Sequence, residues 1–414
     1  MNYQPQILLD GKPVEKITAF LFPKGGNENP KTLLANAGKS FQGSIVLGMG
    51  FTFDDTNENA TSIATMHELI AKDPRNADRI FPFIGYQEVA NSPTHSHHRY
   101  VINFGEMSED EARKYPDLIA IVETKVKPER DGQKRDALRI RWWQYAEKRP
   151  GLVRAIAQCD RVLVISSQAA VHFALNFLPS NYVFSSNLNV FPLETYAEFC
   201  TMQCRSHEVW ARFFGSSMKD DLSYTPTTCF ETFPFPDNWE TDATLEATGE
   251  AYYTYRAQLI IGTNQGLTTT YNRFHDPQET DPAILKLRDL HAEMDRAVLA
   301  AYGWTDIDTT CEFILDYEDE DDTTSKRKKP YRYRWTQATH DEVLARLLDL
   351  NQKRYDQEMI GGKKAEKGGK KKKEEGKKNA KTPKSQPSIP EADRQLALIP
   401  EPIEQLDVWS QSDF

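Results

Sequence analysis

Residues 161–193, RVLVISSQAAVHFALNFLPSNYVFSSNLNVFPL, are the clearest indicator of the fold class because short β-rich runs alternate in them with turn residues. Val, Ile and Phe suit the pleated, half-buried surface of a strand, whereas Ser, Asn and Pro suit the turns between strands. The runs are RVLVISSQ, HFALNFLP, YVFSSN and LNVFPL. Their succession predicts a small twisted sheet.

A helical segment follows the predicted sheet at residues 194–214. Apolar residues recur in it at the 3.6-residue helical period, so one face should be buried. His207, Cys200 and Cys204 lie on that face, and we interpret them as core residues because two thiols without nearby partners make a poor zinc site. Further helices are predicted at residues 245–261, 282–302 and 341–354.

The order of these elements predicts an α+β fold with three parts. Residues 1–238 form a mixed small-sheet domain, with a strand-rich N-terminal part (1–75) and a main part (76–238). An α-helical C-terminal domain follows at residues 239–358. Residues 359–414 are low in complexity and rich in Lys, which predicts a disordered tail.

The charge distribution is compatible with DNA binding although the chain carries a net charge of −10. Residues 125–161 contain eleven Lys or Arg against five Asp or Glu, and residues 361–385 contain eleven Lys against three Glu. A footprint on DNA requires a local basic face rather than a basic protein. The acidic remainder also leaves open a scaffold that mimics DNA and competes with it for a basic partner.

The sequence predicts a soluble, cytoplasmic protein. Its start, MNYQPQILLDGKP, lacks the basic and then apolar pattern of a signal peptide. No run approaches the ~20 apolar residues of a membrane span, so we expect no membrane contact. Five scattered cysteines are an odd number, which favours reduced thiols.

Candidate catalytic motifs are weak throughout the chain. The (N/D/S)PP(Y/F) motif of an adenine methyltransferase does not occur, and the glycines of Gly48-Met49-Gly50 suit a flexible strand better than a cofactor loop. PDLIAIVETK imitates a PD…ExK nuclease, but a helical pattern would place Asp117 and Glu123 on different faces. The histidines of THSHHRY lack further metal ligands at helical spacing. We therefore predict no catalytic and no metal-binding residue.

Two groups of residues are better candidates for DNA contact. A helix predicted at residues 135–148 carries Arg139 and Arg141 beside Trp142 and Trp143, which suits phosphate binding or stacking. The alternative is a buried Trp pair with a solvated charged face. The second group consists of two polar loops at strand ends. Their side chains suit contacts with base edges, since Gln or Asn can pair with adenine. The alternative is ordinary turn chemistry. The residues of this second group are Ser166, Ser167, Gln168, His172, Ser185, Ser186 and Asn187.

Several longer segments resemble one known family over roughly residues 8–358. They include AGKSFQGSIVLGMGFTF, LIAKDPRNADRIFPFIGYQEV, RWWQYAEKRPGLVRAIA, FGSSM…YTPTTCFETFPFP and YRAQLIIGTNQGLTTTYNRFHDP. The chain is similar to the target-recognition and C-terminal domains of MmeI-like (type IIG/IIL) restriction–modification DNA adenine-N6 methyltransferases. This resemblance implies recognition of a short double-stranded DNA sequence, mainly within residues 162–191. Lys219, in the FGSSMKDD segment, is a further candidate DNA contact.

The resemblance also implies an S-adenosylmethionine-dependent catalytic domain, whose motifs are missing from this sequence. We expect no cofactor in this chain, and a separate methyltransferase or nuclease polypeptide as its partner. Two alternatives stay open: an inactive remnant of such an enzyme, and a diverged DNA methyltransferase or nuclease with an unrecognised site.

Overall fold

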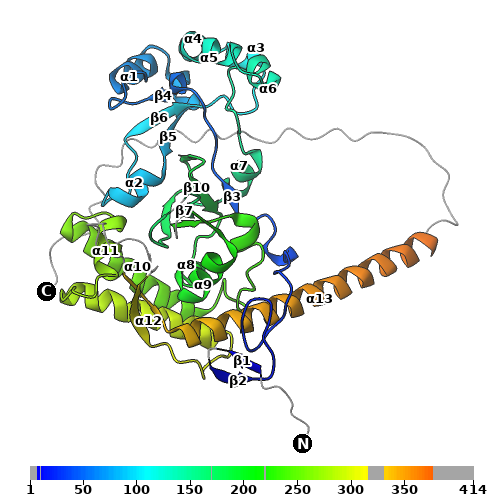
Figure 1. Ribbon diagram of the computed structural model, residues 1–414. Coiled ribbons are helices and arrows are strands. Elements are labelled where there is room, and N and C mark those ends of the chain that lie inside the picture. The colour runs from blue at the N-terminus through cyan, green and yellow to red at the C-terminus, as the bar shows by residue number, and fades with distance from the viewer. Residues whose placement is uncertain (1–6, 10, 169, 219–220, 316–330, 376–414) are drawn as a thin grey trace, which may run out of the picture. The chain divides into compact units, whose positions relative to one another are not determined.

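The α+β class is confirmed by the computed structural model, which describes residues 7–9, 11–168, 170–218, 221–315 and 331–375 (Figure 1). The chain divides into two compact units. The first contains Met1–Leu47, Pro82–His98 and Tyr145–Lys364; the second contains Gly48–Phe81 and Arg99–Gln144, together with the C-terminal residues from Ala365.

The first unit holds most of the strands and all of the long helices among the described residues. Its strands are β1 (Ile7–Leu9), β2 (Lys12–Val14), β3 (Phe41–Gln42), β7 (Arg161–Ser166), β8 (Asn176–Pro179), β9 (Val183–Phe184), β10 (Leu188–Phe191), β11 (Ser216–Met218), β12 (Asp221–Ser223), β13 (Cys311–Leu315) and β14 (Tyr331–Trp335). Its helices are α2 (Tyr86–Asn91), α7 (Pro150–Ile156), α8 (Tyr196–Gln203), α9 (Arg205–Phe214), α10 (Ala243–Thr263), α11 (Leu267–Phe274), α12 (Pro282–Ala301) and, up to Lys364, α13 (Gln337–Glu375).

The predicted small sheet is present for three of its four runs, and its strand order is β3-β10-β7-β8. The fourth run, YVFSSN, forms β9, which pairs instead with β5 (Ile80–Ile84). All three neighbouring pairs are antiparallel. In the central pair, Leu188 of β10 lies opposite Ser166 of β7. Val162 to Ser166 and all of β10 are buried, as expected for strands covered on both faces. The sheet therefore gives the two predicted polar loops a rigid base.

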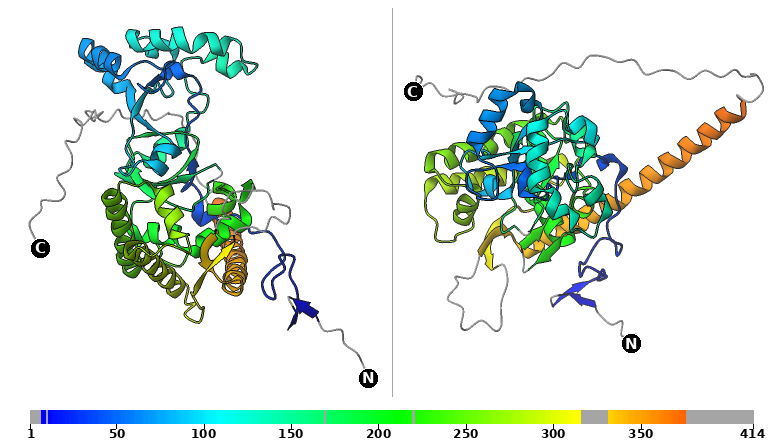
Figure 2. Two further views of the ribbon diagram at one scale, coloured as in Figure 1. Left: turned by 60° about the vertical axis from the view of Figure 1, so that its left-hand side comes forward. Right: turned by 90° about the horizontal axis from the view of Figure 1, so that it is seen from above.

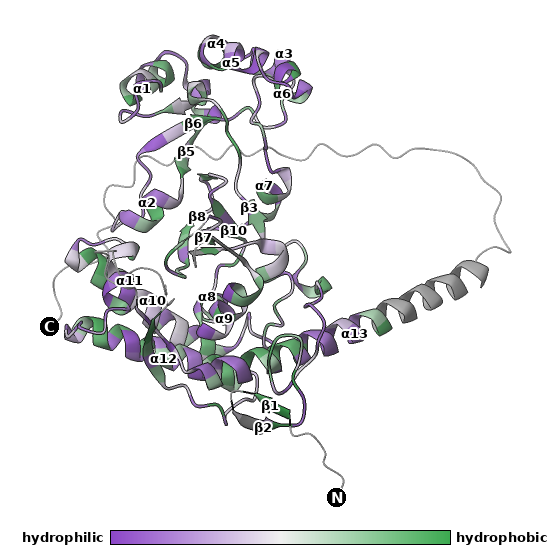
Figure 3. Ribbon diagram, viewed as in Figure 1, coloured by the Kyte–Doolittle hydropathy of each residue, from purple (hydrophilic) through white to green (hydrophobic). Residues whose placement is uncertain are grey.

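Sheet and helices of the first unit share one hydrophobic core, which includes Val164, Phe191, Ile260 and Met294. Helix α10 packs against both α8 and α12, and Figure 2 shows these long helices next to one another. A side chain at Gly249 of α10 would collide with the backbone of α8, so glycine is required for this close approach. The sheet strands are mainly apolar, whereas α12 alternates apolar and polar residues around its axis (Figure 3).

The predicted helix at residues 194–214 is in fact two helices, α8 and α9. Cys204 interrupts them with an extended backbone (ψ 159°), and it caps the start of α9. The prediction that His207, Cys200 and Cys204 are core residues is confirmed, because all three are fully buried. The His207 ring bonds to the Met202 carbonyl and the Tyr224 hydroxyl.

The second unit is built from short elements. They are β4 (Thr52–Phe53), β6 (Arg99–Ile102), α1 (Ile63–Lys72), α3 (Glu109–Ala112), α4 (Pro116–Lys125), α5 (Lys127–Asp131) and α6 (Asp136–Ile140); β5 (Ile80–Ile84) contributes residues to both units. A capping box starts α3, since the Ser108 hydroxyl accepts from the Glu111 amide and Glu111 accepts from the Ser108 amide. Pro116 starts α4, as expected for a residue that fits only the first turn of a helix.

The last helix is longer than predicted. Helix α13 runs to Glu375, past the expected end at residue 354, and the rest of the predicted tail, residues 376–414, lies outside the described residues. The division at residue 238 stays a prediction. None of the described helices has both the length and the apolar character needed to cross a membrane.

Candidate nucleic-acid interface

The two polar loops predicted from the sequence lie side by side at one end of the sheet. Strand β7 ends at Ser166 where β10 begins at Leu188, because the two strands are antiparallel and in register at these residues. The loops are also joined directly: the Ser167 amide donates to the Asn187 carbonyl at 2.9 Å. Residues far apart in the sequence therefore form one polar surface.

The loop at residues 185–187 is held from three directions. The Ser185 amide donates to the Ile84 carbonyl at 2.9 Å. The Ser186 carbonyl accepts from the Ser167 hydroxyl at 2.7 Å and from the Gln42 side-chain amide at 3.0 Å. The Asn187 side-chain oxygen accepts from the Tyr86 amide at 3.0 Å. This loop is preorganised, and the side-chain oxygen of Asn187 serves the protein itself.

The turn after β7 leaves one side chain available. The Ser166 hydroxyl is buried, donates to the Gln168 carbonyl at 3.0 Å and accepts from the Gln168 amide at 3.3 Å. Ser166 therefore performs ordinary turn chemistry. Gln168 is exposed, and its side-chain amide makes no hydrogen bond within the part of the chain that the structure describes. Gln168 retains both the donor and the acceptor that an adenine edge requires.

His172 lies inside the protein rather than on the loop surface. It is 9% exposed, and one ring nitrogen bonds to the Asn272 side chain at 2.7 Å. Its ring stacks on that of His275, with centroids 5.4 Å apart, and Arg332 approaches the other nitrogen at 3.3 Å. Burial and then the Arg332 charge lower the pKa of His172 to about 4. In this geometry His172 supports the turn as a neutral side chain.

The family model described as the MmeI target recognition domain matches residues 28–237, just over half of the chain. The chain belongs to the MmeI target recognition domain family. A solved structure, described as the type IIL restriction-modification enzyme MmeI in complex with DNA, matches with a TM-score of 0.54 and 16% sequence identity. That match covers 83% of this chain and 39% of the other, so this chain spans well under half of that MmeI chain. No curated protein matches.

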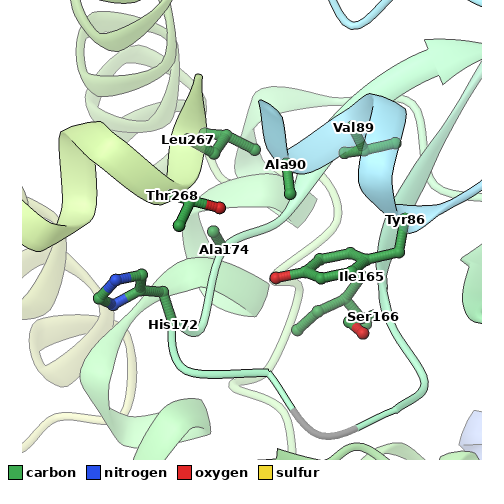
Figure 4. Close-up of a pocket in the computed structure, with 9 residues that line it drawn as sticks. All are labelled: Tyr86, Val89, Ala90, Ile165, Ser166, His172, Ala174, Leu267 and Thr268. Carbon is green, nitrogen blue, oxygen red and sulfur yellow. The ribbon is translucent and has the colours of Figure 1, made fainter. Parts of the chain in front are cut away.

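A small pocket adjoins the β7 turn of this MmeI-type chain (Figure 4). Figure 4 shows Tyr86, Val89 and Ala90 from α2 on one side and Leu267 and Thr268 from α11 on another. The remaining lining residues come from β7 and the segment after it: Ile165, Ser166, His172 and Ala174. Most of these lining side chains are apolar, so they pack beside the turn and offer few groups for polar recognition.

The prediction of a helix over residues 135–148 is wrong, because the helix there is much shorter. Helix α6 ends at Ile140, so it carries Arg139 but not Arg141 or the tryptophans. Trp142 and Trp143 are buried and meet edge to face with centroids 5.8 Å apart, which bears out the alternative of a buried pair. Trp143 also donates to the Met107 carbonyl at 2.9 Å.

The two arginines beside this pair are exposed but differ in their surroundings. Arg139 pairs with Asp136 and donates to the Gln133 carbonyl at 2.8 Å. Arg141 pairs with no carboxylate among the residues that the structure describes. Both lie in the second unit, whereas the polar loops lie in the first. Lys219, the last predicted contact, falls outside the described residues.

The glycines at positions 48 and 50 allow a close approach of the chain to the end of helix α4. A Cβ added at Gly50 would lie 2.5 Å from the Cβ of Lys125, and one at Gly48 would lie 3.1 Å from the Val126 side chain. Glycine at these two positions therefore has a packing role.

The other rejected motifs also have structural roles. Asp117 and Glu123 lie on helix α4 as predicted; Asp117 pairs with Lys72, and Glu123 pairs with Arg113 and Lys127. His95, from the THSHHRY segment, bonds to the Val89 carbonyl at 2.8 Å. Within the described ranges, no group of three His, Cys, Asp or Glu side chains could hold a metal ion.

Sequence reasoning missed Gln42, which contacts the loop at Ser186 although the two are 144 residues apart in the chain. Its segment, KSFQGSI, predicts only a strand that contains a glycine and gives no sign of a contact with the loop. That glycine is required, because a Cβ at Gly43 would lie 2.2 Å from the Ser185 carbonyl oxygen. Such a close approach of β3 to the loop cannot be read from local sequence.

Proposed function

We propose that this chain recognises a short sequence in double-stranded DNA for an adenine-N6 methyltransferase. The chemistry comes from a catalytic domain on a separate polypeptide, which binds S-adenosylmethionine. The recognition surface is the pair of loops that follow β7 and precede β10, within the MmeI-type target recognition region.

The observation that carries this proposal is the exposed amide of Gln168 beside a loop whose Ser186 carbonyl and Asn187 side-chain oxygen are already paired. Base readout needs a free donor and acceptor held at a fixed position, because a mobile side chain loses entropy on binding and discriminates less. Gln168 offers both groups on a short turn that the Ser166 hydroxyl closes. Ser167 and Ser185 are half-buried beside it and offer additional contacts.

Affinity for any DNA sequence comes mainly from phosphate contacts. Arg139 and Arg141 are exposed cations suited to this role. Arg141 carries a charge without a carboxylate partner among the described residues, so it offers DNA the larger electrostatic gain. Both contacts should position the duplex without reading its bases.

The test is sequencing of host DNA for N6-methyladenine with and without the gene, followed by selection of duplexes from a random library by the purified chain. One motif that loses methylation on deletion, and that the chain also selects, supports the proposal. An unchanged methylome combined with selection of one sequence indicates a binder without a methylating partner. Absence of selective DNA binding contradicts the proposal and leaves the remnant or the DNA mimic.

A further inference from the structure

Arg149 has a backbone conformation that L-residues rarely adopt. It precedes α7 with φ 53° and ψ 56°, in the left-handed region that favours glycine or asparagine. A strained, non-glycine residue persists only where the surrounding contacts hold it, and such residues gather at functional sites. Its side chain is therefore a candidate for a specific task.

The guanidinium of Arg149 is anchored at two points on β3 and the residue after it. Its Nε donates to the Gly43 carbonyl at 3.3 Å, and its Nη2 donates to the Gln42 side-chain oxygen at 3.0 Å. Both acceptors are neutral, and no carboxylate among the described residues pairs with Arg149. Nη1 keeps its donors, so the group is a fixed cation that the protein does not neutralise.

The same Gln42 amide connects Arg149 to the polar loop. While its oxygen accepts from Arg149, its nitrogen donates to the Ser186 carbonyl at 3.0 Å. The Ser167 hydroxyl donates to that carbonyl as well, at 2.7 Å. One side chain thus links the guanidinium to both loops of the proposed recognition surface.

We propose that Arg149 binds a DNA backbone phosphate beside the bases contacted by these loops, and that Gln42 is a positioning residue which keeps this contact in register with them. A fixed guanidinium with free donors matches a phosphate oxygen in charge and geometry. Phosphate contacts of this kind set the register of a protein on its duplex. The inference rests on the proposed function, because it assumes DNA at this surface.

The experiment measures dissociation constants of the full chain over a range of salt concentrations. The probes are a duplex that the chain selects from a random library and a random-sequence duplex of equal length. Arg149→Asn removes the charge and tolerates the left-handed backbone. We expect it to lower the magnitude of the salt slope by about one on both duplexes. The ratio between the two affinities should change little.

Two further variants keep the inference falsifiable if Arg149→Asn fails to fold. Gln42→Glu places a carboxylate against Arg149, so the salt slope should fall as it does for Arg149→Asn. Gln42→Ala keeps the charge but releases the guanidinium and the loop, so it should reduce the preference for the selected duplex several-fold with an unchanged slope. Arg346→Gln on α13 is the control, because Asp306 and Glu342 already neutralise Arg346.

If Arg149→Asn and Gln42→Glu fold but keep the wild-type salt slope, the inference is overturned. The proposed function still stands in that case, provided that the wild type selects one DNA sequence. If the wild type binds duplexes without selecting a sequence, the slopes still decide the role of Arg149 although base recognition fails. A wild type that binds neither duplex overturns both proposals.

Discussion

Polar side chains serve opposite purposes in two regions of the first unit. Where α9 meets α12, Arg205, His291 and Asp295 are at most 3% exposed, and they bond to one another. At the end of β7 and β10, backbone groups and the hydroxyls of Ser166 and Ser167 are also paired, but Gln168 is exposed and its side chain is unpaired within the described residues. The first network is closed, whereas the second is open at Gln168.

Pairing alone therefore does not distinguish structural residues from recognition residues. A buried charge has to be paired within the protein because its desolvation is costly. A recognition residue has to stay unpaired at the surface while its neighbours hold it. His172 belongs to the closed kind although its sequence position suggested the open kind. Variants of each kind should therefore change different measurements.

The largest effect is expected from Asp295→Ala, which opens the closed network. Burial would raise the pKa of Asp295, but the Arg205 charge and the contact with His291 lower it to about 2, so the carboxylate is ionised when folded. Its removal leaves the Arg205 charge buried without its partner, and such losses cost about 3–5 kcal/mol. Urea unfolding followed by circular dichroism measures this free energy.

The control for this prediction is Asp306→Ala, which removes an exposed partner of Arg346. Exposed pairs contribute little, so the unfolding free energy should change far less than for Asp295→Ala. Equal losses in the two variants would show that the Arg205–Asp295 network is not a closed, desolvated one.

The second effect is a pH dependence of stability in His172→Gln. The folded-state pKa of His172 is about 4, below its ordinary value of 6.5, so between these values only the unfolded chain binds the proton. Wild-type stability therefore falls as pH decreases from 6.5 to 4. Removal of this histidine should reduce that slope by about 1.4 kcal/mol per pH unit. Urea unfolding at several pH values measures it.

The comparison variant for His172 is His207→Gln in the core, where the folded-state pKa is also about 4. Both variants should change the pH slope in the same direction, and neither should change the DNA sequence that the chain selects. If His172→Gln changes the DNA sequence that the chain selects and His207→Gln does not, His172 is a recognition residue and its structural role is refuted.

The third effect is a loss of sequence discrimination in Gln168→Ala. Loss of a base-reading residue costs about 1–3 kcal/mol and relaxes specificity at one position. Competition binding with single-base variants of the selected duplex would measure it, while the urea midpoint should stay constant. Gln278→Ala, at another exposed glutamine, is the control. Unaltered discrimination in Gln168→Ala would show that the second network is not open at this residue.

The smallest effect is expected from the exposed arginines of the second unit. Arg141→Gln should lower the magnitude of the salt slope of DNA binding by about one. Arg139→Gln should lower it less, because Asp136 already neutralises part of the Arg139 charge. Titrations at several salt concentrations measure both slopes. If neither variant changes the salt slope, these two arginines do not contact DNA.

Local patterns predicted the elements well. The runs at residues 161–193 became β7 to β10, because strand patterns depend on neighbours in sequence. Prediction failed at Cys204, where one helical period continues through a break in the helix. It also failed for residues 135–148, where the helix ends at Ile140 and the two tryptophans after it are buried.

The candidate site was predicted only as a pair of polar loops. Ser166, Gln168 and His172 look alike in a sequence, since each is a polar residue beside a strand. Their exposure and partners separate them: Ser166 closes the turn, His172 is buried against Asn272, and Gln168 faces solvent. Gln42 and Arg149 were not predicted as contacts of this surface.

The α+β class and most strand and helix segments could be predicted from the sequence because they follow from local periodicity, whereas the family was predicted from the resemblance of longer segments. Which polar groups are free depends instead on the tertiary structure. Antiparallel pairing of β7 with β10 places two distant loops together, and β3 brings Gln42 to Ser186 from 144 residues away. Burial and hydrogen bonding depend on such long-range neighbours, which no local pattern encodes.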